Sequence, residues 1–203
     1  MPKEIISISL NEFMQFIIKP GYARKRFVEL KKEARQKDYT PIEDYWRRFR
    51  NGVISLCKGK ITIEDLRELK EDLPDNKVVN YKEAIDGFIT FIKNKKVDWV
   101  EPPRKKTKIS SLRVDVNPEI GFRYRGQVYF AKLFMSSKVS LDRKNADYIL
   151  SVMEHELRDK VEKDAVFSII DAKSGRKYDY RGVDKYLDAE VEAESFISYW
   201  NKI

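Results

Sequence analysis

The change in the spacing of apolar residues near position 100 constrains the fold more than any other feature of this sequence. Before it, apolar side chains recur at helical intervals, whereas after it runs such as LRVDV and QVYFAKLFM are typical of strands. Pro102 and Pro103 lie between the two regions and interrupt regular structure, because proline lacks a backbone donor. We therefore predict a basic helical domain over 1–99, a Pro/Lys-rich linker over 100–111 and a second domain over 112–203.

The first domain is predicted to be all-helical. Four stretches place a capping side chain three residues before an acid, which is the spacing that satisfies free amides at a helix start. They are Ser9-Leu10-Asn11-Glu12, Thr40-Pro41-Ile42-Glu43, Thr62-Ile63-Glu64-Asp65 and Asn80-Tyr81-Lys82-Glu83. Together with breaks at Pro20-Gly21, Gly59 and Pro74, they predict helices at 10–18, 22–36, 41–58, 63–73 and 81–95.

The second domain is predicted to be a small mixed sheet with two helices. Strands are expected at 112–116 and 127–135, with a tight turn at 124–127 before the second. A long helix over 140–163, a hairpin over 165–180 and an acidic amphipathic helix over 183–203 follow. The order strands, helix, strands, helix predicts an α+β fold.

Length and composition indicate a folded protein without disulfides or membrane spans. A chain of 203 residues can bury a core without covalent staples, and Cys57 is its only cysteine. Because Cys57 lies on the apolar side of a predicted helix, it is interpreted as a core residue in a reducing compartment. No apolar run approaches the roughly 18 residues of a membrane span, and the N-terminus lacks signal-peptide features, so no membrane contact and a cytoplasmic location are expected.

The positive charge of the chain is concentrated near its beginning. The net charge is +8, and residues 19 to 60 contribute all of it, with 13 basic and 5 acidic side chains. A basic region of this kind attracts polyanions through their phosphates. Nucleic acid, either DNA or RNA, is therefore the expected partner, although basic residues can also simply solvate a helix.

Two predicted helices carry the candidate nucleic-acid-binding residues. On the second helix, an apolar arc of Phe27, Leu30 and Ala34 is expected to pack while a basic arc faces water. On the third, aromatic and aliphatic residues, Tyr45, Trp46, Phe49, Val53 and Leu56, are interpreted as core, with arginines on the flanks. The candidate phosphate-binding residues are Arg24, Lys25, Lys31, Lys32, Arg35, Arg47, Arg48 and Arg50.

Lys132 interrupts a run from Val128 to Met135 that is apolar on both faces and is therefore predicted to be a central strand. An amine there needs a carboxylate or a path to water, because an isolated buried charge is strongly unfavourable. Asp115 and Asp171 are the candidates on strands. We predict an ion pair with one of them, so that Asp115, Lys132 and Asp171 form a polar cluster.

Asp171-Ala172-Lys173 has the acid-x-lysine spacing used by restriction-endonuclease-like nucleases, where an acid on a neighbouring strand completes the metal site. Asp115 or Glu119 could supply that acid. However, Ser174-Gly175 follows at once and favours a turn, which would place Lys173 at a hairpin tip. A long predicted helix also separates Asp115 from Asp171, and the three-residue motif is short enough to arise by chance. A hairpin turn is therefore the preferred interpretation.

No other motif indicates catalysis, so no catalytic residue, metal ligand or cofactor is predicted. His155, the only histidine, lacks the second histidine of a zinc-protease helix, and the eight glycines form no phosphate-binding loop. We expect a non-enzymatic nucleic-acid-binding protein that uses its basic N-terminal helices, with the α+β domain for assembly or partner contact. Two alternatives remain open: a protein-interaction or inhibitor module that uses the acidic C-terminal helix, and a divergent metal-dependent nuclease.

Overall fold

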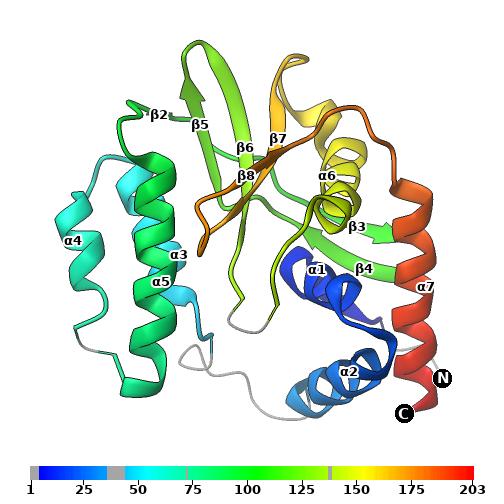
Figure 1. Cartoon of the computed structure of the whole chain (residues 1–203). Coiled ribbons are helices and arrows are strands. Elements are labelled where there is room, and N and C mark those ends of the chain that lie inside the picture. The colour runs from blue at the N-terminus through cyan, green and yellow to red at the C-terminus, as the bar shows by residue number, and fades with distance from the viewer. Residues whose placement is uncertain (1–4, 36–43, 72, 137–138) are drawn as a thin grey trace.

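The computed structural model describes residues 5–35, 44–71, 73–136 and 139–203, which form helices around two β-sheets (Figure 1). The mixture of helix and sheet confirms the predicted α+β class. The helices are α1 (Leu10–Ile18), α2 (Gly21–Arg35), α3 (Arg47–Cys57), α4 (Ile63–Glu68), α5 (Asp75–Ile92), α6 (Arg143–Leu157) and α7 (Tyr186–Lys202), with a 3₁₀ turn at Arg158–Lys160. The strands are β1 (Ser7–Ser9), β2 (Asp98–Trp99), β3 (Lys105–Ile109), β4 (Leu112–Val116), β5 (Ile120–Tyr124), β6 (Gln127–Phe134), β7 (Val166–Asp171) and β8 (Lys177–Asp179).

The larger sheet has five strands in the order β2-β5-β6-β7-β8, and the smaller has three in the order β1-β4-β3. In the larger sheet β6 and β7 are parallel and are joined by α6, while the neighbouring pairs are antiparallel. The predicted turn before β6 is present, with Arg125 and Gly126 both at positive φ, as a two-residue hairpin with a primed turn requires. It fixes the register that places Ile120 opposite Ala131.

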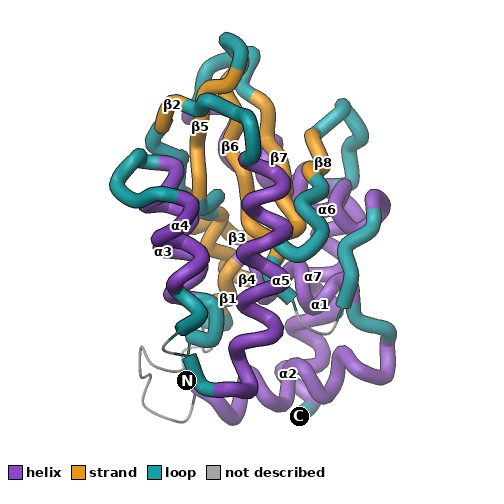
Figure 2. Tube along the Cα trace, turned by 60° about the vertical axis from the view of Figure 1, so that its left-hand side comes forward, coloured by secondary structure: helices purple, strands orange, loops and turns teal. Residues whose placement is uncertain are grey.

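Strand β6 lies in the centre of the larger sheet and is buried on both faces, as the apolar run around Lys132 predicts. Phe130 and Phe134 pack into one core cluster with residues of α1, α6 and α7, whereas Ala131 and Leu133 pack into another with residues of α3 and α5. Helices α3, α4 and α5 lie side by side next to the strands (Figure 2), and Figure 1 shows α6 and α7 on the other side of the larger sheet. The helices therefore cover the larger sheet from both sides.

The all-helical N-terminal layout is not confirmed, because β1 pairs in parallel with β4. Ile6 and Ile8 are buried while Ser7 and Ser9 alternate with them, a period-two pattern that is visible in the sequence. Each core cluster also contains residues from both sides of the predicted linker. The linker segment 100–111 itself includes β3, which pairs along its full length with β4.

The helix boundaries agree with the predictions at α1 and within one residue at α2. The predicted bounds were wrong by five or six residues at the start of α3, the end of α4, the start of α5 and the end of α6. The capping boxes at Ser9 and Thr62 are both present. The prediction of a helix start at Asn80 was wrong, because α5 begins at Asp75 after Pro74, and the Asn80 amide instead donates to the Tyr45 hydroxyl at 2.9 Å. The Thr40–Glu43 box lies outside the described residues.

The turn between β7 and β8 has the geometry expected of a hairpin. The Asp171 carboxylate accepts from the Lys173 amide at 3.1 Å and the Ser174 hydroxyl at 2.7 Å, and Gly175 adopts a φ of 68°. This turn lies directly against Gly87 of α5, where an added Cβ would come within 2.2 Å of the Lys173 carbonyl oxygen. Close packing of helix on turn therefore depends on glycine at position 87.

Candidate nucleic-acid interface

The basic side chains predicted on α2 are used mainly to hold α2 against neighbouring helices. Arg24 forms an ion pair with Glu192 of α7 at 2.8 Å and also donates to the carbonyl oxygens of Ile17 and Lys19 at 3.1 Å each. The two paired side chains are only 20% and 19% exposed. Arg24 is therefore a packing residue that links the chain's beginning to its last helix.

Lys31, Lys32 and Arg35 make similar internal contacts. Lys31 pairs with Glu12 of α1 at 2.7 Å, and Lys32 donates to the Trp200 carbonyl oxygen at 3.1 Å. The Arg35 guanidinium lies over the Trp200 ring, 4.6 Å from its centroid. Although burial acts to raise the pKa of the Glu12 carboxyl, the charge of Lys31 and hydrogen bonds from Lys31 and Ser9 lower it below its ordinary value.

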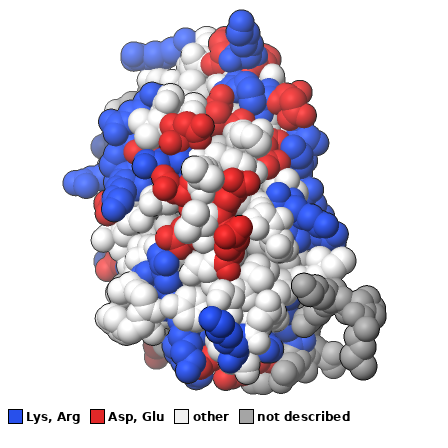
Figure 3. Space-filling view, turned by 90° about the vertical axis from the view of Figure 1, so that its right-hand side faces the viewer, with Lys and Arg blue, Asp and Glu red and all other residues white. Residues whose placement is uncertain are grey.

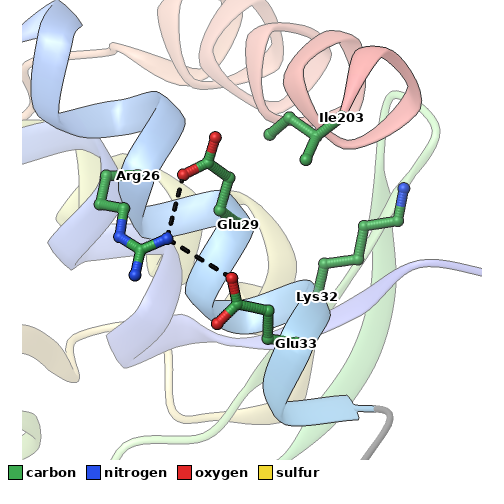
Figure 4. Close-up of a pocket in the computed structure, with 5 residues that line it drawn as sticks. All are labelled: Arg26, Glu29, Lys32, Glu33 and Ile203. Atoms are coloured by element: carbon green, nitrogen blue, oxygen red, sulfur yellow. Dashed lines mark hydrogen bonds and ion pairs between the residues drawn. The ribbon is translucent and has the colours of Figure 1, made fainter.

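The outer side of α2 carries charges of both signs. A pocket of about 440 Å³ lies there between α2 and Ile203, and Figure 4 shows Arg26 reaching toward two carboxylates within it. Arg26 pairs with Glu29 at 3.2 Å and Glu33 at 3.4 Å, and Lys25 approaches Glu29 at 3.7 Å. Because acids alternate with bases, this pocket offers a phosphate chain no continuous positive surface.

The packed face of α2 also differs from the prediction. Phe27 and Val28 are buried, whereas Leu30 is 47% exposed and Ala34 is exposed. The predicted arc of Phe27, Leu30 and Ala34 was therefore wrong in two of its three members. Burial of Val28 places the core-facing side toward Arg24, Lys31 and Lys32, which explains their contacts with α1 and α7.

The arginines predicted on α3 are more accessible. Arg47 and Arg48 are exposed, while Arg50 pairs with Asp44 at 2.6 Å. The aromatic residues beside them point inward, as predicted: Trp46 stacks on Tyr81 with ring centroids 5.3 Å apart, and Phe49 is fully buried. These rings stabilise the core and are not available to stack on bases.

A concentration of lysines lies where the C-terminal ends of α3 and α5 meet, and the sequence did not reveal it. Residues from both ends, among them Cys57 and Ile92, line a single pocket of about 540 Å³. Five lysines follow these two helix ends within four residues, and we call them the lysine cluster: Lys58, Lys60, Lys93, Lys95 and Lys96. All but Lys95 are exposed.

Carboxylates offset the lysine cluster only in part. Lys58 approaches Glu101 at 3.7 Å and lies over the Trp99 ring, and no other member has an ion pair within the described part of the chain. Burial, followed by the positive charge of nearby Lys177, lowers the pKa of Lys95. Cations at helix C-termini interact favourably with the helix dipole, which explains why each lysine is tolerated locally. Because the two helix ends share a pocket, their lysines add positive charge to one region of the surface.

Lys132 is buried and ion-paired, but with a partner other than those predicted. Its Nζ lies 2.5 Å from the Glu119 Oε1, and the side chains are 2% and 8% exposed. The prediction of Asp115 or Asp171 was wrong, since Asp171 is engaged in the β7–β8 turn and Asp115 lies in the smaller sheet. The register of the β5–β6 hairpin explains the pairing, because Ile120 opposite Ala131 sets Glu119 opposite Lys132. That register was available from the predicted turn.

This pair bears directly on the nuclease hypothesis. Glu119 lies immediately before β5 and opposite Lys132 of β6, which resembles the first acid and the lysine of the nuclease arrangement. However, Phe130 occupies the position where an acid-x-lysine motif needs its acid. The Glu119 Oε2 already accepts from the Leu133 amide at 2.7 Å. Lys173 pairs with Glu83 of α5 instead of facing Asp171. Within the described ranges, no group of three or more His, Cys, Asp or Glu side chains could hold a metal ion.

Comparison with known proteins adds no family assignment. The sequence matches no protein-family model and no curated protein sequence. Among the helices that the structure describes, none is long and apolar enough to cross a membrane.

Proposed function

We propose that this protein binds nucleic acid without catalysing a reaction on it, and that the lysine cluster is its principal phosphate-binding surface. The observation that carries the proposal is the pocket shared by the ends of α3 and α5, because the segments that follow these ends bear the five lysines. Lys95 and Lys96 line this pocket, and in the described residues the five lysines have one carboxylate partner. Lysine is a compact positive charge suited to phosphate contact. Arg47 and Arg48 are exposed at the start of α3 and add two positive charges at the opposite end of that helix.

The lysine cluster replaces the basic face of α2 as the preferred interface. On α2, Arg24 and Lys31 are already paired with Glu192 and Glu12, so phosphate contact there would have to displace internal ion pairs. Such displacement costs free energy, whereas exposed and unpaired lysines can contact phosphates directly. The charge distribution along the sequence thus favours the same class of partner, but the contacts in the structure favour a different surface.

Fluorescence anisotropy with labelled single-stranded and duplex DNA and RNA at two salt concentrations tests the proposal. The wild-type protein should bind with a strong salt dependence. Changing Lys60, Lys93 and Lys96 to glutamate should weaken binding at least tenfold and reduce the slope of log affinity against log salt by about 2 on single strands, at about 0.7 per lost contact.

A matched control distinguishes the effect of losing the lysine cluster from the effect of lowering the net charge. Lys82, Lys144 and Lys163 are exposed lysines elsewhere on the chain, and their triple change to glutamate alters the net charge equally. The control should retain most of the affinity. Equal losses in both variants would remove the lysine cluster as the site, and absence of binding by the wild-type protein at low salt would refute the proposed function.

A protein-interaction role is the second candidate, and one feature of α7 favours it. Leu187 and Val191, one helical turn apart, are 74% and 59% exposed. Figure 3, which faces the side where α7 lies, shows acidic side chains gathered at the centre of this face with basic ones around them. A protein partner captured by the wild-type chain and lost on Leu187→Gln/Val191→Gln, but kept by the lysine-cluster variant, would support this role.

A further inference from the structure

The pocket that Lys95 and Lys96 of the lysine cluster help to line also has an apolar lining, which the phosphate-binding role alone does not require. Its volume of about 540 Å³ lies within the range of small-molecule sites. The apolar part of the lining comes from the end of α3, the start of α4, and the end of α5 with the segment that follows it. The apolar lining residues are Leu56, Cys57, Ile63, Ile92 and Val97.

Polar groups occupy one part of the lining. Asn94, Lys95 and Lys96 contribute to it, and Asn94 adopts a left-handed conformation with φ of 61°. The Asn94 side chain makes no hydrogen bond with any described residue, so its amide can donate to and accept from a ligand. Lys95 is directed back to the Phe91 carbonyl oxygen, which leaves Lys96 as the accessible charge in the lining.

The carboxylates beside the pocket do not cancel this charge. Glu64 follows Ile63 and pairs with Arg67 at 3.5 Å, while Asp98 follows Val97. Against them stand Lys95 and Lys96 in the lining and Lys58, Lys60 and Lys93 on the segments beside it, of which Lys58 approaches Glu101. A ligand that fits therefore has a flat or compact apolar body, hydrogen-bonding edges and an adjacent negative charge.

We propose that this pocket accepts one unpaired base of a single-stranded nucleic acid, while the flanking phosphates contact the lysine cluster. The inference rests on the proposed function and deepens it by naming the form of nucleic acid. A nucleobase combines an apolar face with donor and acceptor edges, and its phosphates follow at fixed short distances. Bases inside a duplex are paired and stacked, so they cannot enter such a pocket without being flipped out.

Two oligonucleotides of equal length separate base recognition from phosphate attraction. One is single-stranded oligothymidine, and the other is the same sugar-phosphate chain with abasic sites throughout, which presents identical charge. Wild-type protein should bind the base-bearing strand at least fivefold more tightly at moderate salt. Equal affinity for the two strands would overturn the pocket assignment and leave the proposed function standing, whereas no binding to either would refute both.

A substitution in the apolar lining tests whether the preference for the base-bearing strand arises in this pocket. Val97→Gln puts an amide into the apolar lining without changing the charge. It should bring the ratio of the affinities for the base-bearing and abasic strands close to 1, while binding of the abasic strand persists. The matched control is Val79→Gln, at a valine that is 65% exposed on α5 outside the pocket lining, and it should keep the wild-type ratio. An unchanged ratio in a folded Val97→Gln protein would overturn the proposal.

Free nucleotides share the chemistry of a base beside a phosphate, and a competition experiment distinguishes them. Thymidine monophosphate should displace the bound strand only at concentrations at least a hundredfold above the strand's dissociation constant, because it lacks the flanking phosphate contacts. Displacement at equal concentrations would assign the pocket to a free nucleotide and overturn the single-strand proposal.

Discussion

Arg24 of α2 and Glu192 of α7 form an ion pair with 2.8 Å between Nη1 and Oε2, across 168 positions of sequence. The same guanidinium donates to two main-chain carbonyl oxygens that precede α2. A side chain that the charge pattern indicates as solvent-facing is therefore part of the packing between the two ends of the chain.

We predict that Arg24→Gln lowers the free energy of unfolding by about 1–3 kcal/mol, because it leaves Glu192 and two carbonyl groups without their partner. Urea denaturation measures this change. Lys25→Gln is the control, since Lys25 is 64% exposed and lies 3.7 Å from Glu29, and it should cost less than about 1 kcal/mol. Similar costs for both variants would show that the Arg24 contacts do not stabilise the helix pair.

Gly87→Ala should destabilise the protein by about 1–3 kcal/mol or more, because its Cβ would lie 2.2 Å from the Ala172 and Lys173 carbonyl oxygens. Both obstacles are backbone atoms, so the turn or α5 has to move. Gly21→Ala, with nothing within 4 Å of its added Cβ, is the matched control. A thermal melting temperature unchanged in Gly87→Ala would contradict the close contact between helix and turn.

Removing one partner of the Lys132–Glu119 pair should cost about 3–5 kcal/mol, because the other charge then remains buried alone. Lys132→Met is the test. Adding Glu119→Gln should recover part of the loss, since the amide oxygen can still accept from the Leu133 amide that Glu119 now binds. Lys185→Met, which breaks the exposed pair with Asp188, should change stability little. A Lys132→Met protein as stable as that control would show that the buried pair is dispensable.

Glu12 should contribute to loss of stability in acid. Its pKa in the folded protein lies below the ordinary value of 4.5, so the folded state holds the charged form more strongly than the unfolded state does. The stabilisation is present above about pH 4.5 and is lost as pH falls through the folded pKa. Glu12→Gln should therefore flatten the decline in unfolding free energy between about pH 5 and pH 3 in urea titrations.

Lys31→Gln provides a second check on the same pair. It removes the charge that lowers the Glu12 pKa and should flatten the same part of the pH profile. Because both variants act through one interaction, the double variant should add little to either. Additive effects would show that the acid sensitivity arises elsewhere.

The sequence by itself determined the caps and turns whose contacts involve only neighbouring residues. The capping boxes at Ser9 and Thr62, the turn before β6 and the turn at Asp171 all involve atoms within a few positions, so residue types and spacing suffice to predict them. The two-sided apolar run around Lys132 likewise identified the central strand. The alternation at 6–9 carried the signal for β1, but its partner strand lies more than 100 positions away.

Only the tertiary structure decided what each charged surface contacts. Helical spacing predicted that the bases of α2 face water, but it could not show that α1 and α7 would supply Glu12 and Glu192 as their partners, because the packing of distant helices depends on the whole core. The lysine cluster depends on the same kind of packing: α3 contacts α5, and the ends of both helices, each followed at once by a lysine, contribute residues to one pocket. Sequence specifies local conformation over a few residues, whereas a binding surface is assembled from segments that only the folded core brings together.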